Sequence, residues 1–129
     1  MVDASVILDT LQLVADRHGD PTKRIYDRLF AAHPDLERLF DMDRDGGVRA
    51  EMVQVAFACI LDQVGEKLTA PGVIVAARQH HDGYGVPDGR FDAIFDAMTD
   101  TFADILAEDW TFERDAHWRA LMAEFAAMR

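Results

Sequence analysis

Cysteine is nearly absent from this chain of 129 residues, in which Cys59 stands alone. One cysteine cannot close an internal disulfide, and it cannot build a thiolate metal cluster. Cys59 lies within the apolar run Val55–Leu61, so we expect it to be a small buried hydrophobic side chain.

Basic residues and long hydrophobic runs are also scarce. The chain has 13 basic and 24 acidic residues, a net charge of −11, and its basic residues are scattered singly. A duplex or an anionic membrane would repel this charge, which argues against nucleic-acid and lipid-surface partners. No apolar run approaches the roughly 20 residues of a membrane span, and the first residues lack the pattern of a signal peptide. We therefore expect a soluble, reduced, cytoplasmic domain.

Strand signals are missing, whereas apolar residues recur at spacings of three and four, as in amphipathic helices. This pattern predicts an all-α single domain over residues 1–129 with about seven helices. We expect a helix ending at Gly19, one from Pro21 to His33, a short piece from Pro34, a long one over 48–66, one from Thr69 to His81, one carrying Phe91 through Leu106, and one capped by Thr111.

The segment Asp41–Gly47 alternates acidic residues in the manner of a calcium-binding loop. Such a loop needs a bidentate glutamate at its twelfth position, which is Met52 here. Glu51 comes one place early, and one helical step turns its carboxylate by about 100°. The interpretation we favour is an acidic corner that caps the next helix, with calcium binding through Asp41, Asp43 and Asp45 as the alternative.

Three polar side chains lie among apolar neighbours on different expected helices. His81 follows Ala77 and Val73 on one helix face, Arg49 begins an apolar stripe, and Tyr26 is surrounded by apolar residues. A histidine, a tyrosine and an arginine around apolar walls would suit a flat hydrophobic cofactor that carries an axial metal. Periodicity alone does not bring these three helices around one cavity.

Two motifs carry a resemblance to a known family. The segment Ile25–Phe40 (IYDRLFAAHPDLERLF) is similar to the second and third helices of bacterial globins, especially the haem domain of flavohaemoglobins. The segment His81–Val86 resembles the globin segment in which glycine and valine follow the proximal histidine by four and five residues. Trp118 matches the tryptophan of the final helix. The resemblance spans nearly the whole chain and implies a globin fold around a haem pocket.

The resemblance implies roles for individual residues. His81 would be the proximal ligand of the iron in haem b, and Phe40 would pack on the haem face. Tyr26 matches the distal tyrosine, whose hydroxyl can donate a hydrogen bond to a gas ligand. His80 is turned about 100° from His81 and would face solvent or a propionate, so we assign it no iron.

The distal helix departs from the pattern of such globins. Arg49 occupies the position that aligns with their distal glutamine or histidine, and Val53, one turn further on, would line the distal pocket. A guanidinium always donates and never accepts, so Arg49 could stabilise a partly negative ligand or pair with a propionate. A shift in register after the acidic corner would give these roles to Ala50 or Gln54.

The proximal side departs as well, because Phe91 replaces the tyrosine that links the proximal histidine of flavohaemoglobins to a glutamate. Without that relay, the histidine should be a weaker electron donor to iron. The resemblance therefore implies reversible binding of dioxygen or another diatomic gas, such as carbon monoxide or nitric oxide.

Two alternatives stay open. One is an NO dioxygenase-type subunit; the chain has no Gly-x-Gly-x-x-Gly element, so this enzyme would need a separate reductase as redox partner. The other is a haem-free regulatory module with a globin fold. No residue is assigned a catalytic role, and whether the protein is an enzyme is left open.

Overall fold

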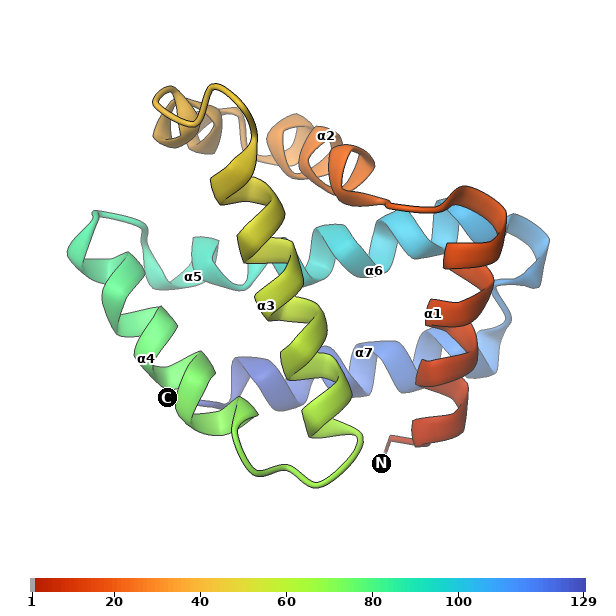
Figure 1. Ribbon diagram of the computed structural model, residues 1–129. Helices are drawn as coiled ribbons and strands as arrows, with labels where there is room; N and C mark the ends of the chain where they lie inside the picture. Colours follow the sequence, from red (N-terminus) through yellow and green to blue (C-terminus); the bar gives the residue numbers. More distant parts are fainter. Residues whose placement is uncertain (1) are drawn as a thin grey trace.

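Seven α-helices and two 3₁₀ segments make up the computed structural model, which describes residues 2–129 and contains no strand among them (Figure 1). This confirms the all-α expectation. The elements are α1 (Ala4–His18), α2 (Thr22–Ala32), η1 (Pro34–Phe40), α3 (Gly47–Gln63), α4 (Ala70–Gly83), α5 (Asp88–Phe91), α6 (Ala93–Leu106), η2 (Ala107–Asp109) and α7 (Phe112–Ala126).

Short polar side chains begin several of these helices. Asp3 accepts a hydrogen bond from the N–H of Ser5 at the start of α1, and Asp20 accepts one from the N–H of Thr22 at the start of α2. Thr111 accepts one from the N–H of Arg114 in the first turn of α7, as the sequence predicted. Each of these bonds satisfies a backbone donor that has no partner within its helix.

The helix expected to carry Phe91 through to Leu106 is divided into α5 and α6 at Asp92. The carboxylate of Asp92 receives two hydrogen bonds from Arg78 of α4, at 2.9 and 3.0 Å. This contact comes from another helix, so the local apolar spacing contained no sign of it.

The long helix α3 ends at Gln63, three residues before the expected Glu66. The carboxylate of Asp62 explains this end, because it accepts hydrogen bonds from three backbone N–H groups beyond the helix. The donors are those of Leu68, Thr69 and Ala70, at 3.2, 3.0 and 2.7 Å. These bonds turn the chain sharply from α3 into α4.

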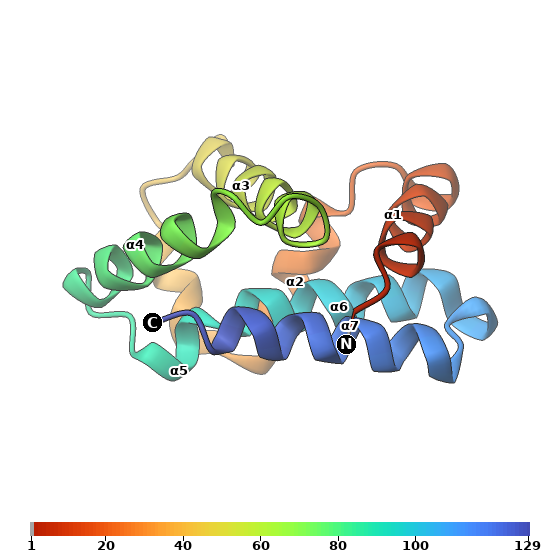
Figure 2. The ribbon, with the colours of Figure 1, turned by 90° about the horizontal axis from the view of Figure 1, so that it is seen from below.

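The helices form two layers, with α1, α3 and α4 on one side of the paired helices α6 and α7 (Figure 2). Helix α2 packs against α6, and α1 packs against both α6 and α7. The largest fully buried side chains come mainly from these helices; they include Trp118, Phe102, Phe125, Ile7, Ile25 and Met98. Helices α3 and α4 pack against each other, and the space between them, η1 and α5 is left for the site described next.

In the part of the chain from residue 2 onward, no helix combines the length and apolar character needed to cross a membrane.

Candidate functional site

An apolar cavity of about 650 Å³ opens between η1, α3, α4 and the α5–α6 segment. This volume falls within the range typical of small-molecule sites. Most of its lining is aliphatic or aromatic, with few polar groups. The lining comprises Leu29, Leu36, Leu39, Phe40, Met42, Asp43, Val48, Glu51, Met52, Val55, Ala56, Cys59, Val73, Ile74, Ala77, His80, His81, Tyr84, Val86, Arg90, Phe91, Ile94 and Phe95.

His81 lies on the α4 wall of this cavity and is partly buried. Its Nδ1 is 2.7 Å from the carbonyl oxygen of Ala77, one helical turn earlier. A carbonyl only accepts, so Nδ1 is the donor in this bond, and in the neutral ring the lone pair lies on Nε2. This is the tautomer that a histidine needs in order to bind a metal through Nε2.

Phe40 of η1 lines the cavity as part of a cluster of three aromatic side chains. Its ring centroid lies 5.5 Å from that of Tyr26 and 5.6 Å from that of Phe30, with tilted or edge-on packing. Such pairs are favourable arrangements for aromatic rings. The cluster therefore holds Phe40 in place as a rigid part of the wall.

Helix α3 presents one apolar stripe to the cavity and buries another. Val48, Met52, Val55 and Cys59, spaced by four, three and four residues, line the cavity together with Ala56. Val53 and Ile60 belong to the neighbouring stripe and are fully buried in the core. Because both stripes are apolar, the sequence pattern could not show which one faces the cavity. Burial raises the pKa of the Cys59 thiol, which keeps it protonated and unreactive.

Arg49 and Val53 lie outside the residues that line the cavity. The guanidinium of Arg49 is bound to Asp43: its Nε lies 3.1 Å from Oδ2, and its Nη2 donates to the backbone oxygen at 2.8 Å. The alternatives Ala50 and Gln54 are exposed and also lie outside the lining. The distal roles assigned to Arg49 and Val53 remain predictions for the haem-bound protein.

Tyr26 is buried directly behind Phe40 and is itself outside the lining. Its hydroxyl donates a hydrogen bond to the carbonyl oxygen of Arg49 at 3.1 Å. Burial raises the pKa of this hydroxyl above its ordinary value of 10.0, so it is a protonated donor at neutral pH. Its distal role likewise remains a prediction.

The acidic corner acts as a helix cap. Asp43 accepts hydrogen bonds from the backbone N–H groups of Val48 and Arg49, both at 3.0 Å, and Asp45 accepts one from Gly47. The bond from Val48, with those from Arg49, holds the pKa of the Asp43 carboxyl below its usual range. Residues 2–129 contain no group of three or more histidine, cysteine or acidic side chains arranged for a metal ion.

Few of the side chains that line the cavity are charged or polar. Arg90 of α5 pairs with Asp35 of η1, with Nε and Oδ2 3.3 Å apart. His80 is exposed, and its ring packs edge-on against Tyr84 at 4.9 Å. The sequence analysis did not identify Arg90, because a lone arginine in a short helix gives no signal of what lies across from it.

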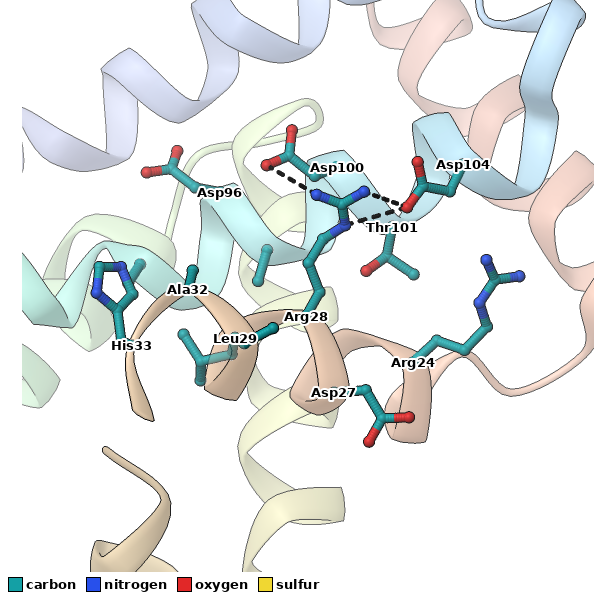
Figure 3. Close-up of a pocket in the computed structure, with 13 residues that line it drawn as sticks. Arg24, Asp27, Arg28, Leu29, Ala32, His33, Asp96, Asp100, Thr101 and Asp104 are labelled. Atoms are coloured by element: carbon teal, nitrogen blue, oxygen red, sulfur yellow. Dashed lines mark hydrogen bonds and ion pairs between the residues drawn. The ribbon is translucent and has the colours of Figure 1, made fainter. Parts of the chain in front are cut away.

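A second cavity, of about 570 Å³, lies between α2 and α6 and has a different character (Figure 3). Arg28 reaches across it and pairs with Asp100, at 3.9 Å, and with Asp104. Arg24, Asp27 and Asp96 add further charge. Covering these groups with an apolar ligand would remove their water at a large cost, so this cavity is a poor site for a hydrophobic cofactor.

The family model described as Globin matches residues 23–128, well over half of the chain. The chain belongs to the globin family, whose members generally bind haem and, through it, diatomic gases. Comparisons with curated proteins and with solved structures gave no match.

The donor set of the apolar cavity fits this family property. A haem needs apolar walls for its faces, a neutral imidazole for its iron, and polar groups for its propionates. The cavity has largely apolar walls from α3 and η1 and the imidazole of His81, whose Nδ1 donates to Ala77. The other polar groups of its lining are Asp43, Glu51, His80, Tyr84 and Arg90.

Proposed function

We propose that this protein holds haem b in the apolar cavity through His81 and reversibly binds dioxygen, carbon monoxide or nitric oxide. The observation that carries the proposal is the hydrogen bond from His81 Nδ1 to Ala77, which leaves Nε2 available on the wall of an apolar cavity of suitable size. Ferrous haem supplies the reversible coordination of diatomic gases when it is bound.

In this proposal the other residues bind and orient the cofactor. Phe40 packs on one face, supported by its aromatic neighbours, and Arg90 and His80 donate hydrogen bonds to the propionates. Tyr26 and Arg49 tune gas affinity from the distal side, and Val53 supports that side from the core. Phe40 lines the cavity and contacts Tyr26. This contact supports a place for Tyr26 one side chain behind the distal wall of the cavity.

Gas binding is favoured over oxygen-activating chemistry by the partner of His81. A neutral carbonyl pulls less on the imidazole proton than a carboxylate does, so the ring donates less electron density to a metal. An NO dioxygenase-type subunit would also require a separate reductase.

We also propose that the chain is a cytoplasmic, single-domain globin of the bacterial type, similar to the haem domain of flavohaemoglobins. The motif Ile25–Phe40 supports that kinship.

The test is an absorption spectrum of the protein purified after expression with added haem, recorded before and after reduction and addition of carbon monoxide. We expect one haem per chain and a Soret band that shifts with the gas. A folded, helical protein that takes up no stoichiometric haem would contradict the proposal and leave the haem-free regulatory module. Rapid oxidation of the oxygenated protein by nitric oxide, sustained by a reductase, would instead identify the dioxygenase.

A further inference from the structure

Arg78 of α4 is a buried arginine whose donors are all engaged. Its side chain is only 8% exposed. Nε donates to the carbonyl oxygen of Met128 at 3.1 Å, and Nη2 donates to that of Phe125 at 3.1 Å and to Asp92 at 3.0 Å. Nη1 donates to Asp88 at 3.1 Å and to Asp92 at 2.9 Å. The five N–H groups of the guanidinium therefore meet five acceptor atoms from α5, the α5–α6 junction, the last turn of α7 and the residues just after it.

Phe91 contacts both this guanidinium and the imidazole of His81. The Cζ of Arg78 is 4.6 Å from the centroid of the Phe91 ring, the distance of a cation–π contact. The His81 ring centroid is 5.3 Å from the same phenyl ring, at an interplanar angle of 69°. Phe91 is 9% exposed, so both contacts are largely shielded from water, which strengthens the first.

We propose that Arg78, acting through Phe91, is a positioning residue that sets the orientation of the His81 ring. This inference rests on the proposed function, in which His81 is the iron ligand. The hydrogen bond to Ala77 holds one edge of the imidazole, but a single hydrogen bond allows the ring to tilt about it. The phenyl ring of Phe91 supplies the second contact, and Arg78 keeps Phe91 from moving.

Charge alone does not explain the arrangement. Asp92 and Asp88 already neutralise the guanidinium, and a lysine could balance the same charges at this position. A lysine has a single nitrogen and cannot span acceptors on three segments at once, whereas the planar fork of arginine can. The guanidinium also stacks over the aromatic ring of Phe91. A strongly hydrated ammonium group makes this contact less favourably. The geometry thus links the end of α7 to the proposed iron ligand.

The first experiment uses the protein without haem, so its result does not depend on the proposed function. Nuclear magnetic resonance of the histidine side chains follows His81 in the wild type, Phe91→Leu and Arg78→Lys. We expect both variants to move the His81 ring resonances away from their ring-current-shifted positions. The resonances of His18, His33 and His117, which are remote in sequence from this contact, should stay nearly unchanged. Arg114→Lys is the matched control, because Arg114 is also shielded and multiply bonded but lies on α7 beside α1.

The second experiment uses the haem-loaded protein and measures the iron–histidine stretching vibration by resonance Raman, together with the rate of haem loss. We expect Phe91→Leu and Arg78→Lys to shift the vibration and to speed haem loss about tenfold, as for partners that orient a metal ligand. Arg114→Lys should change neither.

Phe91→Leu keeps every hydrogen bond of Arg78, so the proposal is testable even if Arg78→Lys does not fold. Unchanged His81 resonances in folded Phe91→Leu would overturn it. An iron–histidine vibration that shifts equally in Arg114→Lys would also overturn the proposal, because the shift would then come from a general loss of stability. A wild type that binds no haem would defeat the proposed function, while the resonance experiment would still decide the contact between Phe91 and His81.

Discussion

The hydroxyl of Tyr26 donates a hydrogen bond of 3.1 Å to the carbonyl oxygen of Arg49, which joins the middle of α2 to the first turn of α3. Arg49 is held in turn by Asp43. The two side chains assigned to the distal side are therefore linked to each other and to the cap of α3. A change in one of them should affect both gas binding and stability.

Tyr26→Phe removes this bond while keeping the ring in its aromatic cluster. We expect the free energy of unfolding to fall by about 1 kcal/mol, the usual net value of one buried hydrogen bond. We also expect faster dioxygen dissociation from the haem-loaded protein, measured by stopped flow. Tyr84→Phe, at an exposed position, is the control for the unfolding measurement. An unchanged dissociation rate would remove Tyr26 from the distal side.

His81→Ala should abolish stable haem uptake, because it removes the imidazole whose Nδ1 is fixed by the preceding turn of α4. His80→Ala should keep the haem spectrum, since that side chain is exposed and is assigned no iron. The measurement is haem stoichiometry from the Soret band after gel filtration. A normal haem spectrum in the protein lacking both histidines would refute the proximal assignment.

The rotation of α3 can be tested with Met52→Ala and Val53→Ala. Val53 is 1% exposed in the core, so its truncation should lower the free energy of unfolding by about 2 kcal/mol. Met52 is half-buried at the cavity, so its truncation should cost under about 1 kcal/mol and mainly alter carbon monoxide rebinding. Denaturant unfolding and flash photolysis measure these effects. A larger loss of stability in Met52→Ala than in Val53→Ala would mean that α3 presents its other stripe to the cavity.

Asp43→Asn should weaken the start of α3 in a manner that depends on pH. The folded-state pKa of Asp43 lies below the ordinary value of 3.8, so its contribution to stability is present above that value and is lost as the pH falls through the folded-state pKa. Wild type and variant should therefore differ at neutral pH and converge in acid, as followed by urea unfolding. Asp41→Asn is the control, because its exposed carboxylate makes none of the capping bonds. A difference that persists in acid would show that the effect does not come from the carboxylate charge.

Much of the helical plan was predictable because it depends on neighbours in sequence. Thr111 caps α7 as expected, and Trp118 and Phe125 are buried as the spacing of three and four indicated. His81 and Phe40, identified by resemblance, line one cavity. The break at Asp92 and the pairing of Arg90 with Asp35 beside the cavity were not predictable, because each depends on a partner in another element.

The amino-acid sequence by itself determined where helices begin and end in most places, which residues are apolar, and the family motifs around Tyr26 and His81. These features come from interactions within one or two helical turns. Only the tertiary structure decided which stripe of α3 faces the cavity, where the guanidinium of Arg49 lies, and that Arg78 reaches Phe91. The rotation of a helix about its axis is decided by packing against helices distant in sequence, and two apolar stripes give a local pattern no basis for choosing between them.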